Sequence, residues 1–97
     1  MNNRIEIYTL KYPVEYGDTV VSELHLRRPR GKQLKRFNLD ALDSGNIGAY
    51  MEALADLSDQ APAMIDMMEG EDIFAASKVV GDFLRDIGQY LTEPSAS

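Results

Sequence analysis

The hydrophobic pattern of this chain changes its period once, near residue 29, and this change constrains the fold more than any other feature. Before it, polar and apolar residues alternate as they do in strands: Ile5 and Ile7 fall on one face, Tyr8 and Leu10 on the other. After it, apolar residues recur every three or four positions, as they do on helices. We therefore predict an α+β fold in which an N-terminal β-hairpin packs against three to four α-helices.

The hairpin is expected at about residues 4–28. Its first strand should end before Pro13, and Gly17-Asp18 provides a tight turn. The second strand should end at Pro29 and place Leu24 and Leu26 on its apolar face, with His25 on the polar face. Because a lone hairpin is marginal in water, helices must cover the apolar face.

Four helices are predicted, at about 31–39, 45–58, 62–69 and 72–91, within a single domain of residues 1–97. Ser44 is a candidate N-cap of the second, Pro62 suits the first turn of the third, and Gly70 should close that helix. In the last helix Gly81 and Gly88 share a face that a neighbouring backbone could approach. Residues 92–97 should be frayed.

The charge of the chain is unevenly distributed. Residues 1–38 hold eight Lys/Arg and four Asp/Glu, a net of +4, whereas residues 39–97 hold two and twelve, a net of −10. There is no cysteine, no signal-peptide pattern and no apolar run long enough to span a membrane. These features indicate an intracellular domain that has no membrane partner.

We predict no catalytic activity, no metal and no cofactor. His25 has no cysteine or second histidine to join it. The carboxylates of the turn near residue 70, including Asp72, should be solvated, and they lack the spacing of a calcium loop. Nucleotide-binding glycine motifs are also absent from the sequence.

Surplus apolar surface predicts an oligomer or a groove for a protein partner. Three methionines lie close together, at positions 64, 67 and 68, and methionine suits surfaces that accept varied apolar partners. The last helix carries apolar residues around more of its circumference than a hairpin could cover.

The basic stretch at residues 27–36 leaves an alternative open, a small nucleic-acid-binding regulator. Phe37 is its only neighbouring aromatic residue, and the acidic half of the chain would repel phosphates. Steep salt dependence of binding would support this alternative. A basic rim paired with the acidic half of the same fold is the simpler interpretation.

Three segments resemble the tail assembly chaperones of tailed bacteriophages and their prophages, especially the Mu-like, tail assembly protein E group. They are TLKYPVEYGDTVVSELHLRRPRGKQL, ALADLSDQAPAMIDMMEGEDI, in which Asp72 would open the last helix, and KVVGDFL. The resemblance as a whole spans roughly residues 8–91. The resemblance implies a non-enzymatic protein of the bacterial host cytoplasm. It would bind the tape measure protein, keep it soluble, help recruit tail tube subunits, and be absent from the mature virion.

The resemblance also implies a longer product made by a ribosomal frameshift, for which the Asp-Phe-Leu tripeptide at residues 82–84 is a permissive site. A secretion-type chaperone, also small and acidic, is a third hypothesis. For the chaperone hypothesis we predict a charged contact through Arg27, Arg28 and Arg30. The predicted client contacts are Met64, Met67, Met68, Phe74, Phe83 and Tyr90.

Overall fold

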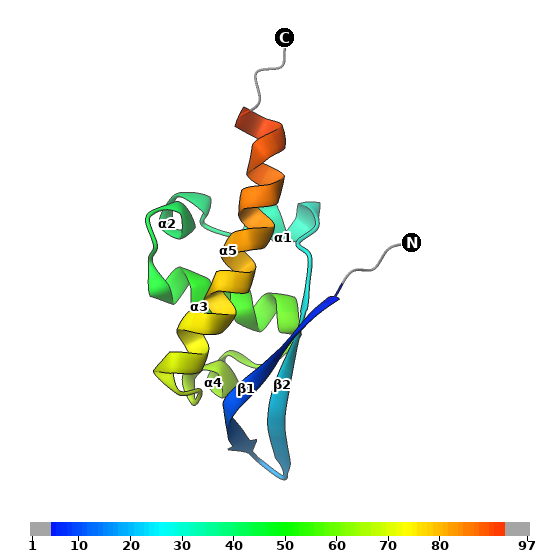
Figure 1. The fold of residues 1–97 in the computed structure, drawn as a ribbon, viewed down its shortest axis with the longest axis vertical. Helices are drawn as coiled ribbons and strands as arrows, with labels where there is room; N and C mark the ends of the chain where they lie inside the picture. The colour runs from blue at the N-terminus through cyan, green and yellow to red at the C-terminus, as the bar shows by residue number, and fades with distance from the viewer. Residues whose placement is uncertain (1–4, 93–97) are drawn as a thin grey trace.

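The computed structural model describes residues 5–92, as an antiparallel hairpin followed by helices (Figure 1). The strands are β1 (Ile5–Tyr16) and β2 (Thr19–Arg27). The helices are α1 (Gly31–Arg36), α2 (Leu39–Asp43), α3 (Ile47–Ser58), α4 (Pro62–Asp66) and α5 (Gly70–Thr92). The α+β prediction is confirmed, with five helices in the described residues rather than three or four.

The hairpin has the predicted turn and the predicted faces. Gly17 has φ +63° at the first central position of the turn, a conformation that glycine adopts without steric cost. Leu24 and Leu26 are fully buried, whereas Ile5 and Ile7 lie on the outer face and are about half exposed. One face of the hairpin is therefore packed and the other is open to solvent.

The prediction that the first strand ends before Pro13 is wrong, because β1 continues to Tyr16 through an irregular segment. Thr9 pairs with Glu23 and Val14 pairs with Val21, so residues 10–13 all stand opposite the single residue Ser22. We call residues 10–13 the bulge. Proline is tolerated there because a bulged residue needs no N–H partner across the ladder.

The helix boundaries differ from the prediction at three places. The helix expected at 31–39 is two helices, since Asn38 accepts a 3.0 Å hydrogen bond from the N–H of Ala41 and starts α2. Asn46 caps α3 in the same way, through the N–H of Ala49, and Ser44 instead ends α2. Gly70 begins α5 rather than closing α4.

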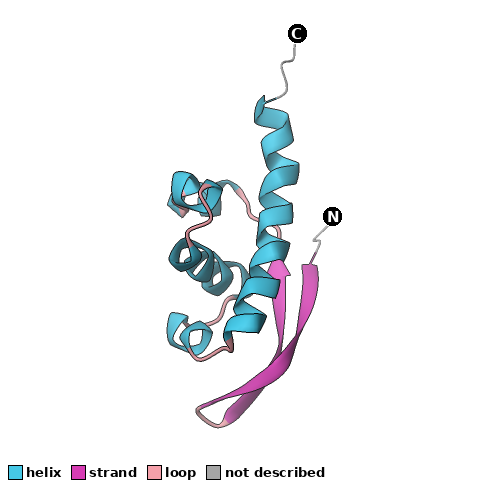
Figure 2. Cartoon of the chain, turned by 60° about the vertical axis from the view of Figure 1, so that its left-hand side comes forward, coloured by secondary structure: helices cyan, strands magenta, loops and turns pink. Residues whose placement is uncertain are grey.

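The core lies where the hairpin, α3, α4 and α5 meet. In Figure 2 the hairpin runs along one side of α5 and the shorter helices lie along the other. β2 packs on α3 and β1 packs on α5. Both views show the last turns of α5 rising beyond the rest of the fold. The largest fully buried side chains of the described residues are Leu24, Leu26, Leu54, Leu57, Met64, Ile65, Asp72 and Val80.

Candidate functional site

Among the residues that the structure describes, Asp72 is the one charged residue whose side chain is fully buried, and it attaches α5 to the bulge. Its carboxylate accepts hydrogen bonds from the hydroxyl of Tyr8 (2.6 Å) and from the backbone N–H groups of Lys11 and Tyr12 (2.9 Å each). Those N–H groups belong to the bulge. The expectation that Asp72 is solvated is therefore wrong: its side chain is 0% exposed.

The pKa of Asp72 reflects two opposed effects. Burial raises it, but the hydrogen bonds from Tyr8, Lys11 and Tyr12 favour the ionised form more strongly, so the pKa lies below its usual value. Burial and the Asp72 carboxylate together raise the pKa of the Tyr8 hydroxyl to about 12. The pair is thus held as carboxylate and neutral phenol at ordinary pH, and every hydrogen bond found for this carboxylate goes to β1. Its role is structural.

The six predicted client contacts divide between core and surface. Met64, Met68 and Phe83 are at most 7% exposed, so a partner could reach them only if the fold opened. Met67 and Phe74 are 55% and 67% exposed, and we call this pair the Met67/Phe74 surface. Tyr90 lies in α5, but its side chain is outside the described part of the chain.

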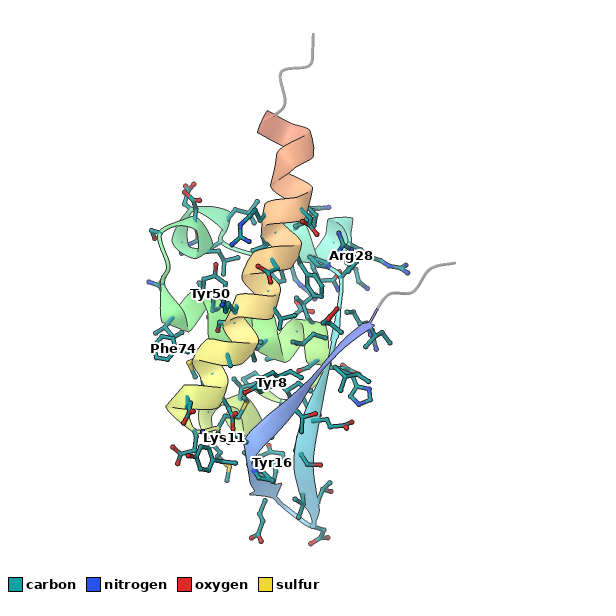
Figure 3. The ribbon with its side chains drawn as sticks, in the orientation of Figure 1. Tyr8, Lys11, Tyr16, Arg28, Tyr50 and Phe74 are labelled. Atoms are coloured by element: carbon teal, nitrogen blue, oxygen red, sulfur yellow. The ribbon has the colours of Figure 1, made fainter. Side chains whose placement is uncertain are left out.

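Phe74 is exposed although only one residue separates it from the buried Asp72. Successive positions on a helix point about 100° apart, so positions 72 and 74 face nearly opposite directions. Figure 3 places the Phe74 ring on the side of α5 away from Tyr8 and Lys11. The sequence could not separate Met67 from Met64 and Met68, because all three lie in a short segment without a clear period.

The basic stretch is partly neutralised by the acidic half of the same chain. Arg36 pairs with Asp56 of α3 at 2.7 Å, and Arg28 lies 3.7 Å from Asp86 of α5. The Arg28 guanidinium also covers the ring of Phe83, 5.4 Å from its centroid. This agrees with the simpler of the two interpretations for Arg28 and Arg36.

Most of the basic stretch, all its cations except Lys35, lines a groove of about 840 Å³ between the open end of the hairpin, α1 and the end of α3. We call it the basic groove. Its charged lining residues are Arg27, Arg28, Arg30, Lys32, Arg36, Asp56 and Asp59. The three predicted charged contacts therefore lie together on one surface, and Figure 3 shows Arg28 at this end of the molecule.

His25 lies exposed on β2, as predicted, with its Nε2 atom 2.9 Å from the Glu23 carboxylate. Within residues 5–92, no cluster of three or more histidine, aspartate or glutamate side chains is arranged to hold a metal ion. The helices that the structure describes include none with the length and apolarity required to cross a bilayer.

The geometry thus defines a small α+β protein with two candidate partner surfaces. The family model described as phage tail assembly chaperone proteins, E, or 41 or 14 matches residues 7–85. The chain belongs to that family. A search of curated proteins found no match, and neither did a search of solved structures.

Proposed function

We propose that this phage tail assembly chaperone binds the tape measure protein, keeps it soluble and helps recruit tail tube subunits around it. The observation that carries the proposal is the family match over residues 7–85. A chaperone of this kind leaves before the virion matures. It works by binding and release, which is consistent with a protein that is not an enzyme.

The Met67/Phe74 surface is the first candidate for the client contact. Two large apolar side chains are more than half exposed there, and apolar area removed from water contributes roughly 25 cal/mol per Å² before the costs of association. Methionine adapts its shape to different neighbours, which suits a client that presents a series of apolar segments. Tyr90 stays in the proposal as a third contact, on the same helix as Phe74.

Weak contacts of this size can still coat a long client. Once one chaperone site is engaged, neighbouring sites on the same client or in a chaperone oligomer bind at a raised effective concentration. The net charge of −6 keeps such assemblies soluble. We include a homo-oligomer in the proposal on this ground, with the bacterial host cytoplasm as the place of assembly.

The experiment that tests the proposal is co-expression with the tape measure protein encoded nearby, followed by size-exclusion chromatography with light scattering. Co-elution of the two proteins is expected, together with aggregation of the tape measure protein when it is expressed alone. If the chaperone elutes alone and its client aggregates regardless, the tape measure assignment fails.

The longer frameshift product is tested by the gene. A slippery run at the codons for residues 82–84 and a second product that extends the first would support it. A Phe83 codon of TTC would remove that slip site.

A further inference from the structure

The basic groove carries more positive charge than the fold neutralises. Arg28 and Arg36 have intramolecular carboxylate partners, Asp86 and Asp56. Within the described residues, Arg27, Arg30 and Lys32 have no carboxylate within 4.0 Å. These three cations lie on consecutive parts of the fold, the end of β2, the connection and the start of α1. They face a shared hollow rather than separate patches of surface.

Contacts within the fold join the elements that line the groove. The Arg36–Asp56 ion pair joins α1 to α3 along one wall. The backbone N–H of Arg30 donates a 2.9 Å hydrogen bond to Gln33, which fixes the start of α1. Pro29, which lies buried within the connection, restricts the backbone next to Arg28 and Arg30. The unpaired cations are therefore carried on a framework that is already ordered before a partner arrives.

The lining also contains apolar and acidic groups, and these decide which anion fits. Ile5, about half exposed, provides apolar area beside the charges, Pro29 and Leu57 are buried in the floor of the groove, and Asp56 and Asp59 stand on the α3 side. Among the described side chains, none that is aromatic lines the groove, so a nucleic acid would find no base-stacking surface on them. A continuous row of phosphates would also pass the two aspartates.

An extended peptide that carries carboxylates meets these conditions better. Its side chains alternate, with roughly 7 Å between those on the same face, so acidic groups can reach the cations while an apolar one reaches the exposed Ile5. Its backbone N–H groups can donate to Asp59, which a phosphate backbone cannot do. Charge complementarity and the mixed lining therefore select the same partner.

We propose that the basic groove is a second binding site of this chaperone, which takes an extended acidic segment of a partner protein through Arg27, Arg30 and Lys32. The inference goes beyond the proposed function, because it needs neither the tape measure protein nor the Met67/Phe74 surface. Two separate sites would let the chaperone hold an apolar client and an acidic partner segment at the same time.

The test is fluorescence anisotropy on the whole chain with a labelled short peptide in which glutamate alternates with leucine. A peptide with glutamine at each glutamate, and an oligothymidylate of similar length, are measured beside it. The groove variant is Arg30→Glu with Lys32→Glu, and the control variant is Lys35→Glu with Lys78→Glu. Lys35 and Lys78 are exposed and lie outside the lining, and both double variants take the net charge from −6 to −10 (two reversals of two charges each).

We expect the acidic peptide to bind, the glutamine peptide not to bind, and the groove variant to weaken binding at least about tenfold, against less than about threefold for the control. If both variants weaken peptide binding equally, the effect comes from overall charge, and the proposed site is wrong. Tighter binding of oligothymidylate than of the acidic peptide would replace it with the nucleic-acid alternative. If circular dichroism shows either variant unfolded, the corresponding Gln variants give the same comparison without charge reversal.

Discussion

The hydroxyl of Tyr8 donates a 2.6 Å hydrogen bond to the carboxylate of Asp72, 64 positions further along the chain. The same carboxylate accepts the two bulge N–H groups that β2 does not pair, those of Lys11 and Tyr12. The Asp72 carboxylate therefore gives β1 the hydrogen-bond acceptors that a neighbouring strand would otherwise provide. The first turn of α5 is also a favourable place for a negative charge, because the amino terminus of a helix carries partial positive charge.

Replacing Asp72 with alanine should lower the free energy of unfolding by about 3 kcal/mol, because buried N–H and O–H donors lose their acceptor. Urea unfolding followed by circular dichroism measures the change. Glu71→Ala is the matched control, since its carboxylate lies next in sequence but forms only an exposed ion pair with Lys11 at 2.9 Å. The control should cost at most about 1 kcal/mol. Equal losses would show that the Asp72 hydrogen bonds do not stabilise the fold.

Acid should weaken the fold through Asp72. Since its pKa is lower in the folded chain than in the unfolded one, its contribution is complete above the unfolded value of about 4 and is lost as the pH falls through the folded value. Asp72→Asn removes this titration, so its stability should fall less between neutral pH and pH values below about 4. Urea midpoints across this range test the claim, and parallel curves for the two proteins would refute it.

Alkali should act on the other partner of the same hydrogen bond. The pKa of Tyr8 is raised to about 12, so its contribution is complete below its unfolded value of about 10 and is lost as the pH rises through 12. Neighbouring Tyr12, Lys11 and Glu71 face the same region and remain in the Tyr8→Phe variant. That variant should therefore lose less stability across this interval than the parent chain. In a pH titration followed by tyrosinate absorbance, the Tyr8→Phe variant should lack one group that titrates at high pH in the parent chain.

Two buried serines should differ in the effect of replacement by alanine. The Ser58 hydroxyl donates a 2.6 Å hydrogen bond to the carbonyl of Leu54, whereas the Ser77 hydroxyl has no partner within the described residues. Both lie in helices and both are under 10% exposed, so the gain in helix propensity is shared. We expect Ser77→Ala to be more stable than Ser58→Ala by about 1 kcal/mol in urea unfolding. The reverse order would mean that the Ser77 hydroxyl is satisfied.

Gly81→Ala should raise the free energy of unfolding by about 0.5–1 kcal/mol, through helix propensity alone. A Cβ at this position would meet the Tyr50 hydroxyl at 3.6 Å, an ordinary contact, so the close backbone approach predicted for this glycine is not what it faces. Gly17→Ala should instead lower the free energy of unfolding by about 1 kcal/mol, because the φ angle of Gly17 is +63°. Thermal unfolding of both variants should shift the midpoint in opposite directions.

The Met67/Phe74 surface gives a prediction about the client. Met67→Ala with Phe74→Ala should weaken association with the tape measure protein at least about tenfold, since each side chain can contribute about 1.5 kcal/mol or more on burial. Ile7→Ala with Val20→Ala is the control, because those residues are 55% and 60% exposed on the hairpin. Light scattering of co-expressed proteins compares them. A larger effect of the hairpin pair would move the client site to β1 and β2.

Much of the fold could be predicted from the sequence because its signals are local. Alternation placed Leu24 and Leu26 on the buried face, and the Gly17-Asp18 pair marked the turn. Apolar spacing predicted α3 and most of α5, whose residues Ile73, Ser77 and Val80 are buried. Each of these features depends on residues within a few positions of one another.

The errors about the end of β1, Asp72 and Phe83 come from contact between residues distant in sequence. The errors in the helix boundaries are different, because they come from local caps such as Asn38 and Asn46. Pro13 is compatible with a strand only because β1 bulges there, and the bulge is stable only because Asp72 accepts its N–H groups. The residues next to the bulge and those next to Asp72 in the sequence do not indicate that the two interact. The same holds for Phe83, which is covered by Arg28 from the other half of the chain.

Because the chain is synthesised from its amino terminus, the hydrogen bonds of Asp72 can form only late in synthesis. The ribosome finishes both strands early, but Asp72, the acceptor for the Lys11 and Tyr12 N–H groups, lies 61 and 60 positions further along the chain and is added much later. Until then the bulge has only water to bond with, and the apolar face of the hairpin has no α5 to cover it. The nascent chain is therefore committed to its native strand pairing late, when the start of its last helix arrives.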